Sequence, residues 1–369
     1  MAGERSAEGE PLDVVVVGGG QAGLAIGYHL AQQRRRFTIL EAAATPAAAW
    51  RERWDSLKLF TPVRFDSLPG MPFPGEPDSY PGRDAVVAYL EAYARRFELP
   101  VEVDSRVRAV EPDERGGYRV RLDDRTYETD QVVIATGPFQ VPRIPPVAAG
   151  LDPAIVQFHS VEYRSPSQIP AGPVLVVGGG NTGYQIAEEL SRHREVHLSV
   201  GSRQTPLPQR VLGRDLFTYL QAARLMQVTV RSRVGQRMQY RETLIGSSPR
   251  AARRRHGIHL HGRTERVEGR EVTFADGGRV QPHAVIWATG FGLDHSLVKA
   301  PVFDDAGHVL HRRGVTSAPG LFFLGLPWQH TRGSALLGWV EDDAAYIADR
   351  VAEHAGRRSA AGPAQAPIA

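Results

Sequence analysis

The N-terminal part of the chain opens with an uninterrupted apolar run, Val14–Val17, that ends in the glycine-rich turn GGGQAG at Gly18–Gly23. Four consecutive β-branched residues are typical of a strand buried on both faces, as in a parallel sheet. Apolar and small residues then recur at helical spacing, and a second apolar strand ends at Glu41. This order predicts a strand–turn–helix–strand unit, the start of a βαβ arrangement.

The same pattern returns in the middle of the chain, where Val174–Val177 runs into GGGNTG at Gly178–Gly183. Two further apolar strands each close in Ala-Thr-Gly, at 135–137 and at 288–290. We therefore expect an α/β fold with two Rossmann-like dinucleotide-binding domains, the second inserted into the first. The expected ranges are 1–165 and 285–355 for the first domain, 170–280 for the second, and 356–369 for a disordered tail.

The first glycine turn has the context that a dinucleotide fingerprint requires, because it follows a strand, opens a helix and precedes an acidic strand end. Gly18 permits the tight turn, Gly20 lets the backbone approach a pyrophosphate, and Gly23 lets helix and strand pack closely. The Glu41 carboxylate suits two free ribose hydroxyls. The candidate residues are Gly18, Gly20, Gln21, Ala22, Gly23 and Glu41.

The second turn differs at the end of its following strand, where Gly201 takes the place of the acidic residue and is followed by Ser202 and Arg203. A carboxylate there would repel a 2′-phosphate, whereas a hydroxyl and a cation attract one. This site therefore predicts NADPH. A hydride donor beside a second dinucleotide indicates FAD at the first turn. The candidate residues are Gly178, Gly180, Asn181, Thr182, Gly183, Ser202 and Arg203.

Composition narrows the remaining function classes. The absence of cysteine excludes a disulfide, a cysteine nucleophile, a thiolate metal site and a redox-active CxxC pair, and we expect no metal site. The formal charge is only +3, and we expect the basic run Arg250–Gly257 to be a solvated loop rather than a nucleic-acid site. No apolar run has the length of a membrane span, so we expect no membrane partner and a cytoplasmic location.

Several longer motifs resemble the class B flavin-containing monooxygenases, in particular a bacterial flavoprotein branch and the plant YUCCA-type enzymes. They are AAWRERWDSLKLFTP from Ala48 to Pro62, SLPGMPFPG, FHSVEYRSP, ATGF and GLPWQHTRGSALLGWV. The resemblance implies an oxidoreductase in which NADPH reduces FAD and a C4a-peroxyflavin forms with O₂. One oxygen atom then passes to a small nucleophilic substrate at nitrogen, sulfur or activated carbon.

The resemblance also implies residue roles, although it implies no catalytic residue. It places Trp50, Leu59 and Thr61 beside the flavin, and the backbone of Val107 at the adenine. It places Gly325 over the flavin. It also places four residues where the chain crosses between the domains, namely Thr136, Gly137, Thr289 and Gly290. Phe60 and Trp328 are the candidate substrate contacts.

His159, Tyr163 and Arg164 match the second half of the family's inter-domain signature. Baeyer–Villiger relatives carry Trp at the position of Tyr163, which favours heteroatom or carbon oxygenation over ester formation from ketones. Three alternatives stay open. They are a Baeyer–Villiger enzyme, an NADPH-dependent reductase or oxidase that passes electrons to a partner protein or to O₂, and a nucleotide-binding accessory protein. The expected partners are a small-molecule substrate and O₂, with a homo-oligomer left open.

Overall fold

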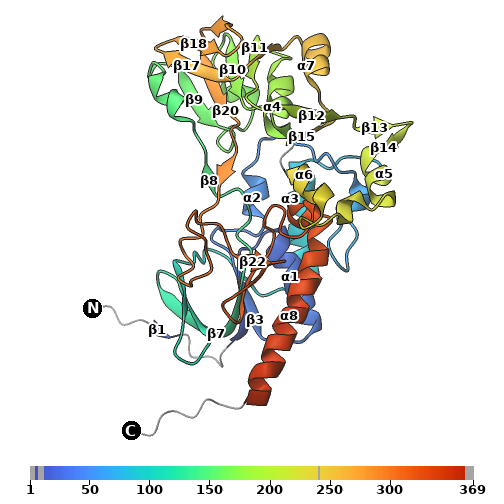
Figure 1. Cartoon of the computed structure of the whole chain (residues 1–369), viewed down its shortest axis with the longest axis vertical. Helices are drawn as coiled ribbons and strands as arrows, with labels where there is room; N and C mark the ends of the chain where they lie inside the picture. The colour runs from blue at the N-terminus through green and yellow to red at the C-terminus, as the bar shows by residue number, and fades with distance from the viewer. Residues whose placement is uncertain (1–4, 7–11, 240–241, 362–369) are drawn as a thin grey trace.

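The computed structural model describes residues 5–6, 12–239 and 242–361. Its two largest sheets form separate α/β units, one above the other in Figure 1. The parallel strands at the centre of each unit confirm the expected α/β fold with two Rossmann-like units. Among the described residues, no helix is long and apolar enough to cross a membrane.

The larger sheet has ten strands, with the order β22-β23-β24-β7-β2-β3-β4 along its main path. Its strands are β1 (Arg5–Ser6), β2 (Leu12–Val17), β3 (Phe37–Leu40), β4 (Val101–Glu102), β5 (Ala109–Pro112), β6 (Tyr118–Arg121), β7 (Arg125–Ile134), β22 (His311–Arg312), β23 (Val315–Thr316) and β24 (Leu321–Phe323).

The valine run of β2 is buried on both faces of this sheet, as the sequence predicts. Val14 and Val16 pack into the cluster formed with helices α1 (Gln21–Gln32), α3 (Arg83–Arg96) and α8 (Val340–Ala361). Val15 and Val17 pack into the cluster on the β5–β6 side. Each buried side chain contributes roughly 1.5–3 kcal/mol relative to exposure. In Figure 1, α1 and α8 lie side by side over the sheet.

The helices are mostly short. The α-helices are α1 (Gln21–Gln32), α2 (Ala48–Arg51), α3 (Arg83–Arg96), α4 (Asn181–Leu190), α5 (Leu216–Ala222), α6 (Arg233–Gln239), α7 (Pro249–His256) and α8 (Val340–Ala361). The 3₁₀ helices are η1 (Val63–Phe65), η2 (Pro146–Gly150), η3 (Pro166–Gln168), η4 (Leu225–Gln227) and η5 (Arg332–Ala335).

The second unit is built on a five-stranded parallel sheet in the order β16-β11-β10-β20-β9. One face of β10 packs on α4, and the other packs on the three-stranded sheet β17-β18-β19. The strands are β9 (Val156–His159), β10 (Val174–Val177), β11 (Val196–Ser199), β16 (His259–His261), β17 (Thr264–Glu268), β18 (Glu271–Phe274), β19 (Arg279–Val280) and β20 (Ala284–Trp287).

Small strand pairs connect the two units and extend the second one. β8 (Val141–Pro142) and β21 (Phe291–Gly292) pair antiparallel where the chain crosses between the sheets. The other pairs are β12 (Gln204–Leu207) with β15 (Glu242–Ile245), and β13 (Arg210–Val211) with β14 (Arg214–Asp215). The segment between β12 and β15 also reaches the first unit, because Gln209 Nε2 donates to the Phe60 carbonyl at 2.8 Å.

The boundaries of the inserted unit differ from the prediction. The predicted ranges leave 156–159 in the first domain, but β9 pairs in parallel with β20 as the edge of the second sheet. Two of the four β9 residues are exposed, so this strand lacks the continuous apolar run by which the other parallel strands were recognised. The inserted unit therefore includes both β9 and β20.

The predicted tail is also corrected. Residues 356–361 were expected to be disordered, yet α8 continues to Ala361. Arg358 holds this end of the helix, because its guanidinium donates to the Gly116 carbonyl at 2.6 Å and pairs with Asp130 at 2.9 Å. Residues 362–369 lie outside the described residues.

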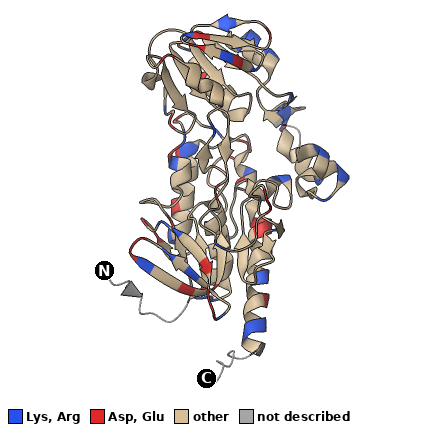
Figure 2. Cartoon of the chain, turned by 60° about the vertical axis from the view of Figure 1, so that its left-hand side comes forward, with Lys and Arg blue, Asp and Glu red and all other residues tan. Residues whose placement is uncertain are grey.

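The basic run at Arg250–Gly257 is a helix rather than the expected loop. Ser248 caps the N-terminus of α7 by accepting from the Ala251 amide, and Gly257 ends the helix in the left-handed conformation at φ +63°. Serine and glycine are residue types that favour these two cap positions. In Figure 2, acidic and basic positions are interspersed over both units.

Candidate functional site

The first glycine turn leaves open space at the start of α1. Gly18 has φ +113°, and a Cβ there would lie 2.5 Å from the Ala135 carbonyl oxygen. A Cβ on Gly23 would lie 1.9 Å from the Gly18 oxygen, which explains the close packing of turn and helix. Gly20 instead faces open space, and no side chain caps the helix behind it. Unpaired amides at a helix N-terminus attract an anionic group such as a pyrophosphate.

Glu41 lies beside this turn at the end of β3, as predicted. Its Oε2 accepts from the Gly19 amide at 2.8 Å, and its Oε1 accepts from the Ala43 amide at 3.0 Å. Each carboxylate oxygen has a further lone pair for a ligand hydroxyl. The two backbone bonds therefore orient Glu41 without exhausting it as an acceptor.

A cavity of about 570 Å³ extends from the first turn to the chain segments at 135–141 and 294–297, where the chain crosses between the units. Ten of the predicted cofactor residues line this cavity, and they come from six separate parts of the chain. They are Gly18, Gly20, Gln21, Ala22, Glu41, Trp50, Val107, Thr136, Gly137 and Gly325. A cavity of this size can hold a large part of a dinucleotide.

Trp50 and Gln21 preorganise the wall of the cavity. The Trp50 indole donates to Gln21 Oε1 at 2.6 Å, and Gln21 Nε2 donates to the Ala335 carbonyl at 3.1 Å. These two bonds connect α2, the start of α1 and η5, which are distant in sequence. The chain's own hydrogen bonds thus hold this wall.

The second glycine turn repeats the geometry of the first. Gly178 has φ +130°, and a Cβ there would lie 2.1 Å from the Ala288 carbonyl oxygen, while Gly183 packs on Gly178. Gly180 precedes α4 in an extended conformation without a side-chain cap. Thr182 lies in the first turn of α4. Asn181 is engaged elsewhere, because its Nδ2 donates to the Thr243 carbonyl and its Oδ1 accepts from the Ile245 amide.

The end of β11 places Ser202 and Arg203 at the surface beside Gly201. Sequence reasoning missed Arg263, which follows β16 and donates to the Gly201 carbonyl at 3.0 Å. It also missed Gln204, whose amide lies against Gly179 and whose Oε1 accepts from the Tyr184 hydroxyl at 3.0 Å. Two arginines therefore flank the position where the first site has Glu41.

The two Ala-Thr-Gly segments join the units through backbone contacts. Gly137 and Gly290 have φ +72° and +80°. The Gly290 carbonyl accepts from the Arg143 amide at 3.0 Å, and Thr289 Oγ1 donates to the Arg143 carbonyl. Thr289 and Gly290 do not line the 570 Å³ cavity, so their predicted roles beside the cofactors stay predictions.

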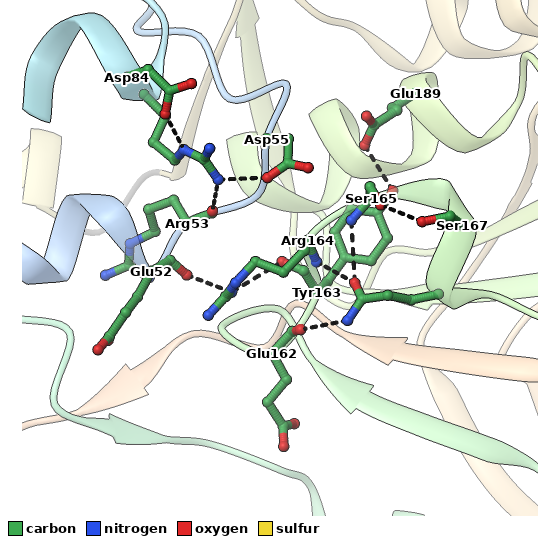
Figure 3. Close-up of polar contacts among 12 residues, drawn as sticks. Glu52, Arg53, Asp55, Asp84, Glu162, Tyr163, Arg164, Ser165, Ser167 and Glu189 are labelled. Atoms are coloured by element: carbon green, nitrogen blue, oxygen red, sulfur yellow. Dashed lines mark hydrogen bonds and ion pairs between the residues drawn. The ribbon is translucent and has the colours of Figure 1, made fainter.

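The inter-domain signature forms a dense polar network at the same junction, which Figure 3 shows. The Tyr163 hydroxyl donates to Glu189 at 2.7 Å, and Arg164 Nη1 donates to the Glu52 carbonyl at 2.6 Å. His159 Nε2 lies 3.1 Å from the Gly290 carbonyl, an acceptor, so Nε2 carries the hydrogen. Burial lowers the pKa of His159 and favours the neutral ring. The neutral ring thus contacts the second connector through the Gly290 carbonyl.

Family comparison decides what kind of protein carries these two sites. A family model described as pyridine nucleotide-disulphide oxidoreductase matches residues 15–325, which include both glycine turns and most of the cavity lining. The chain belongs to this family.

Three relatives refine the comparison within this family. An oxidoreductase named CzcO-like from Geobacillus kaustophilus is 43% identical over 345 residues, covering 93% of this chain and 99% of the relative. The indole-3-pyruvate monooxygenase YUCCA1 of Oryza sativa is 37% identical over 212 residues, covering 55% of this chain and 51% of the relative. A flavin-containing monooxygenase structure from Stenotrophomonas maltophilia is 29% identical with a TM-score of 0.79, covering 94% and 100% of the two chains.

These relatives confirm the resemblance to class B flavin monooxygenases and with it that this family member is an enzyme, an oxidoreductase. The predicted flavin contacts Leu59 and Thr61 and the predicted substrate contacts Phe60 and Trp328, four residues in all, also lie outside the cavity lining. Leu59 packs against the cores of both units. Phe60 stacks on Phe217, with 5.9 Å between the ring centres. Trp328 is half-buried with φ +56°. Their assigned contacts stay predictions.

The fourth, Thr61, is buried and reveals a neighbour that sequence reasoning missed. Its hydroxyl donates to Asp66 Oδ1 at 2.5 Å, and Asp66 is fully buried. Burial raises the pKa of Asp66 to about 7; the Thr61 hydrogen bond opposes this shift and the Asp215 carboxylate adds to it. Asp66 Oδ2 has no hydrogen-bond partner among the described residues. A protonated acid satisfies that oxygen best in an apolar environment.

Proposed function

We propose that this protein is an NADPH-dependent FAD monooxygenase that oxygenates a small nucleophilic substrate. The observation that carries the proposal is the pair of glycine turns with opposite chemistry at the following strand end. The first presents Glu41 to free ribose hydroxyls. The second presents Arg203 and Arg263 around Gly201, where a 2′-phosphate would be attracted.

The residues around the large cavity fit FAD. Open space at Gly20 and the uncapped start of α1 would hold its pyrophosphate, and Glu41 its adenosine ribose. Trp50 and Gly325 come from opposite ends of the chain to border the remaining space. Bound flavin accepts hydride from NADPH and activates O₂, chemistry that no protein side chain supplies.

The chain's own part in this reaction is to position ligands and to exclude water. The bonds between Trp50, Gln21 and Ala335 fix the cavity wall, and the Ala-Thr-Gly connectors set the approach of the second unit. The relatives named as monooxygenases support oxygen transfer. The substrate class includes thioethers, amines and enolisable 2-oxo acids, since each offers a nucleophilic atom.

Isotope incorporation tests the proposal directly. The FAD-loaded protein would be supplied with NADPH and ¹⁸O₂, together with methyl phenyl sulfide, dimethylaniline or phenylpyruvate, and the products analysed by mass spectrometry. We expect one ¹⁸O atom in a product of at least one substrate. Cyclohexanone converted to its lactone would instead indicate a Baeyer–Villiger enzyme. Recovery of all NADPH electrons as peroxide or in a reduced ferredoxin would contradict oxygenation.

A further inference from the structure

Arg53 lies where the two units meet, just after α2, and it lines the large cavity. Its guanidinium carbon lies 4.5 Å from the ring centre of Phe139 and 5.3 Å from that of Phe291. These rings follow the first and the second Ala-Thr-Gly connector. One side chain thus contacts both crossings of the chain between the units.

The guanidinium has no carboxylate partner among the described residues, unlike its neighbours in this segment. Arg51 pairs with Glu91, and Arg83 pairs with Asp55 and Asp84. Figure 3 shows the Arg53 side chain extending away from this network, with no dashed line at its guanidinium. Only its backbone carbonyl takes part, accepting from Arg83 Nη1 at 2.9 Å.

The position is costly for an unpaired cation. Burial lowers the pKa of Arg53 to about 10; the adjacent Glu52 opposes the shift and the charge of Arg164 adds to it. The aromatic faces attract the cation, but they leave the N–H donors in the guanidinium plane unused. A half-buried arginine with free donors that lines a ligand cavity is suited to an anionic ligand group.

We propose that Arg53 is the anion-binding residue of this cavity and takes a phosphate or carboxylate group of a ligand held between the two units. The inference rests on the proposed function, since it assigns a contact within the same site. The shared chemistry has two sources there, the phosphates of the dinucleotides and a substrate carboxylate. Ligand entry replaces the missing counter-charge, while Phe139 and Phe291 keep the guanidinium in place.

Equilibrium binding tests the proposal without turnover. The variants are Arg53→Met, which removes the charge, and Arg53→Lys, which keeps it without the planar donor fork. Arg51→Met is the matched control. Arg51 lies two residues before Arg53 and forms a surface ion pair with Glu91, so this variant removes the same charge outside the cavity. Dissociation constants would be measured for FAD on the apoprotein and for NADP⁺ and benzoate on the FAD-loaded protein. Thermal melting checks the folding of each variant.

Arg53→Met should weaken at least one of the three ligands by about ten- to a hundred-fold, the effect of losing a charge-assisted hydrogen bond. The ligand affected identifies the source of the anion. The dissociation constant of Arg53→Lys for the affected ligand should lie between those of the unaltered protein and Arg53→Met. This second variant keeps the test valid if Arg53→Met fails to fold. If all three constants match those of Arg51→Met, the Arg53 proposal is overturned alone. If the unaltered protein binds neither FAD nor NADP⁺, the proposed function fails with it.

Discussion

Asp66→Asn should remove a pH-dependent loss of stability from this protein. Asp66 is fully buried, Thr61 donates to one oxygen, and the pKa is raised from 3.8 to about 7. The folded state therefore prefers the protonated acid. Relative to the unfolded chain, this preference stabilises the protein below about pH 4 and is lost as the pH rises through about 7.

The size of the effect follows from the shift. Each pKa unit corresponds to about 1.36 kcal/mol, so a shift of roughly three units gives an upper bound of about 4 kcal/mol. Titration of the unfolded carboxyl removes part of this below pH 5, which leaves about 2–3 kcal/mol between pH 5 and pH 8. Asparagine is neutral at every pH and keeps a polar group opposite Thr61.

Urea unfolding followed by tryptophan fluorescence at pH 5, 6, 7 and 8 measures the difference between the variant and the unaltered protein. We expect the free energy of unfolding of Asp66→Asn, relative to that of the unaltered protein, to rise by about 2–3 kcal/mol from pH 5 to pH 8. Asp78→Asn is the control, because Asp78 is an exposed carboxylate of the same region, paired with Arg64. Parallel pH profiles for Asp66→Asn and the unaltered protein would refute a buried, protonated Asp66.

Two further predictions concern the nucleotides. Arg203→Ala and Arg263→Ala should each raise the KM for NADPH about ten-fold or more and leave that for NADH nearly unchanged, because only NADPH carries the 2′-phosphate. Equal effects on both nucleotides in steady-state oxidation assays would contradict the assignment. Glu41→Gln should weaken FAD about ten-fold in fluorescence titrations, since it loses the charge that accepts from the ribose hydroxyls and the Gly19 amide. Unchanged FAD affinity would remove Glu41 from the site.

The glycine turns could be predicted from the sequence because sterics permit no other residue there. A Cβ on Gly18 or Gly178 would meet a carbonyl oxygen within 2.5 Å. Such constraints are local, so a short motif records them. Glu41 and Gly201 follow the first glycine of their turns at the same spacing, so the chemical difference between these two positions can also be read from the sequence.

Contacts between segments that are distant in the sequence could not be predicted from a local motif. Arg263 reaches Gly201 only because β16 pairs with β11, and β16 is a short strand without a long apolar run. Asp66 was invisible for a different reason. Asp66 is fully buried, yet the sequence shows only an ordinary aspartate between Phe65 and Ser67 in a turn-rich segment.

The repeated Ala-Thr-Gly segments connect the glycine turns to the position of Arg53. In each unit the alanine carbonyl, at Ala135 and at Ala288, lies under the first glycine of the turn and so requires glycine there. The connector leaves the sheet at that point, and its next aromatic residue, Phe139 or Phe291, turns toward Arg53. Each nucleotide turn is therefore one short connector away from the same guanidinium.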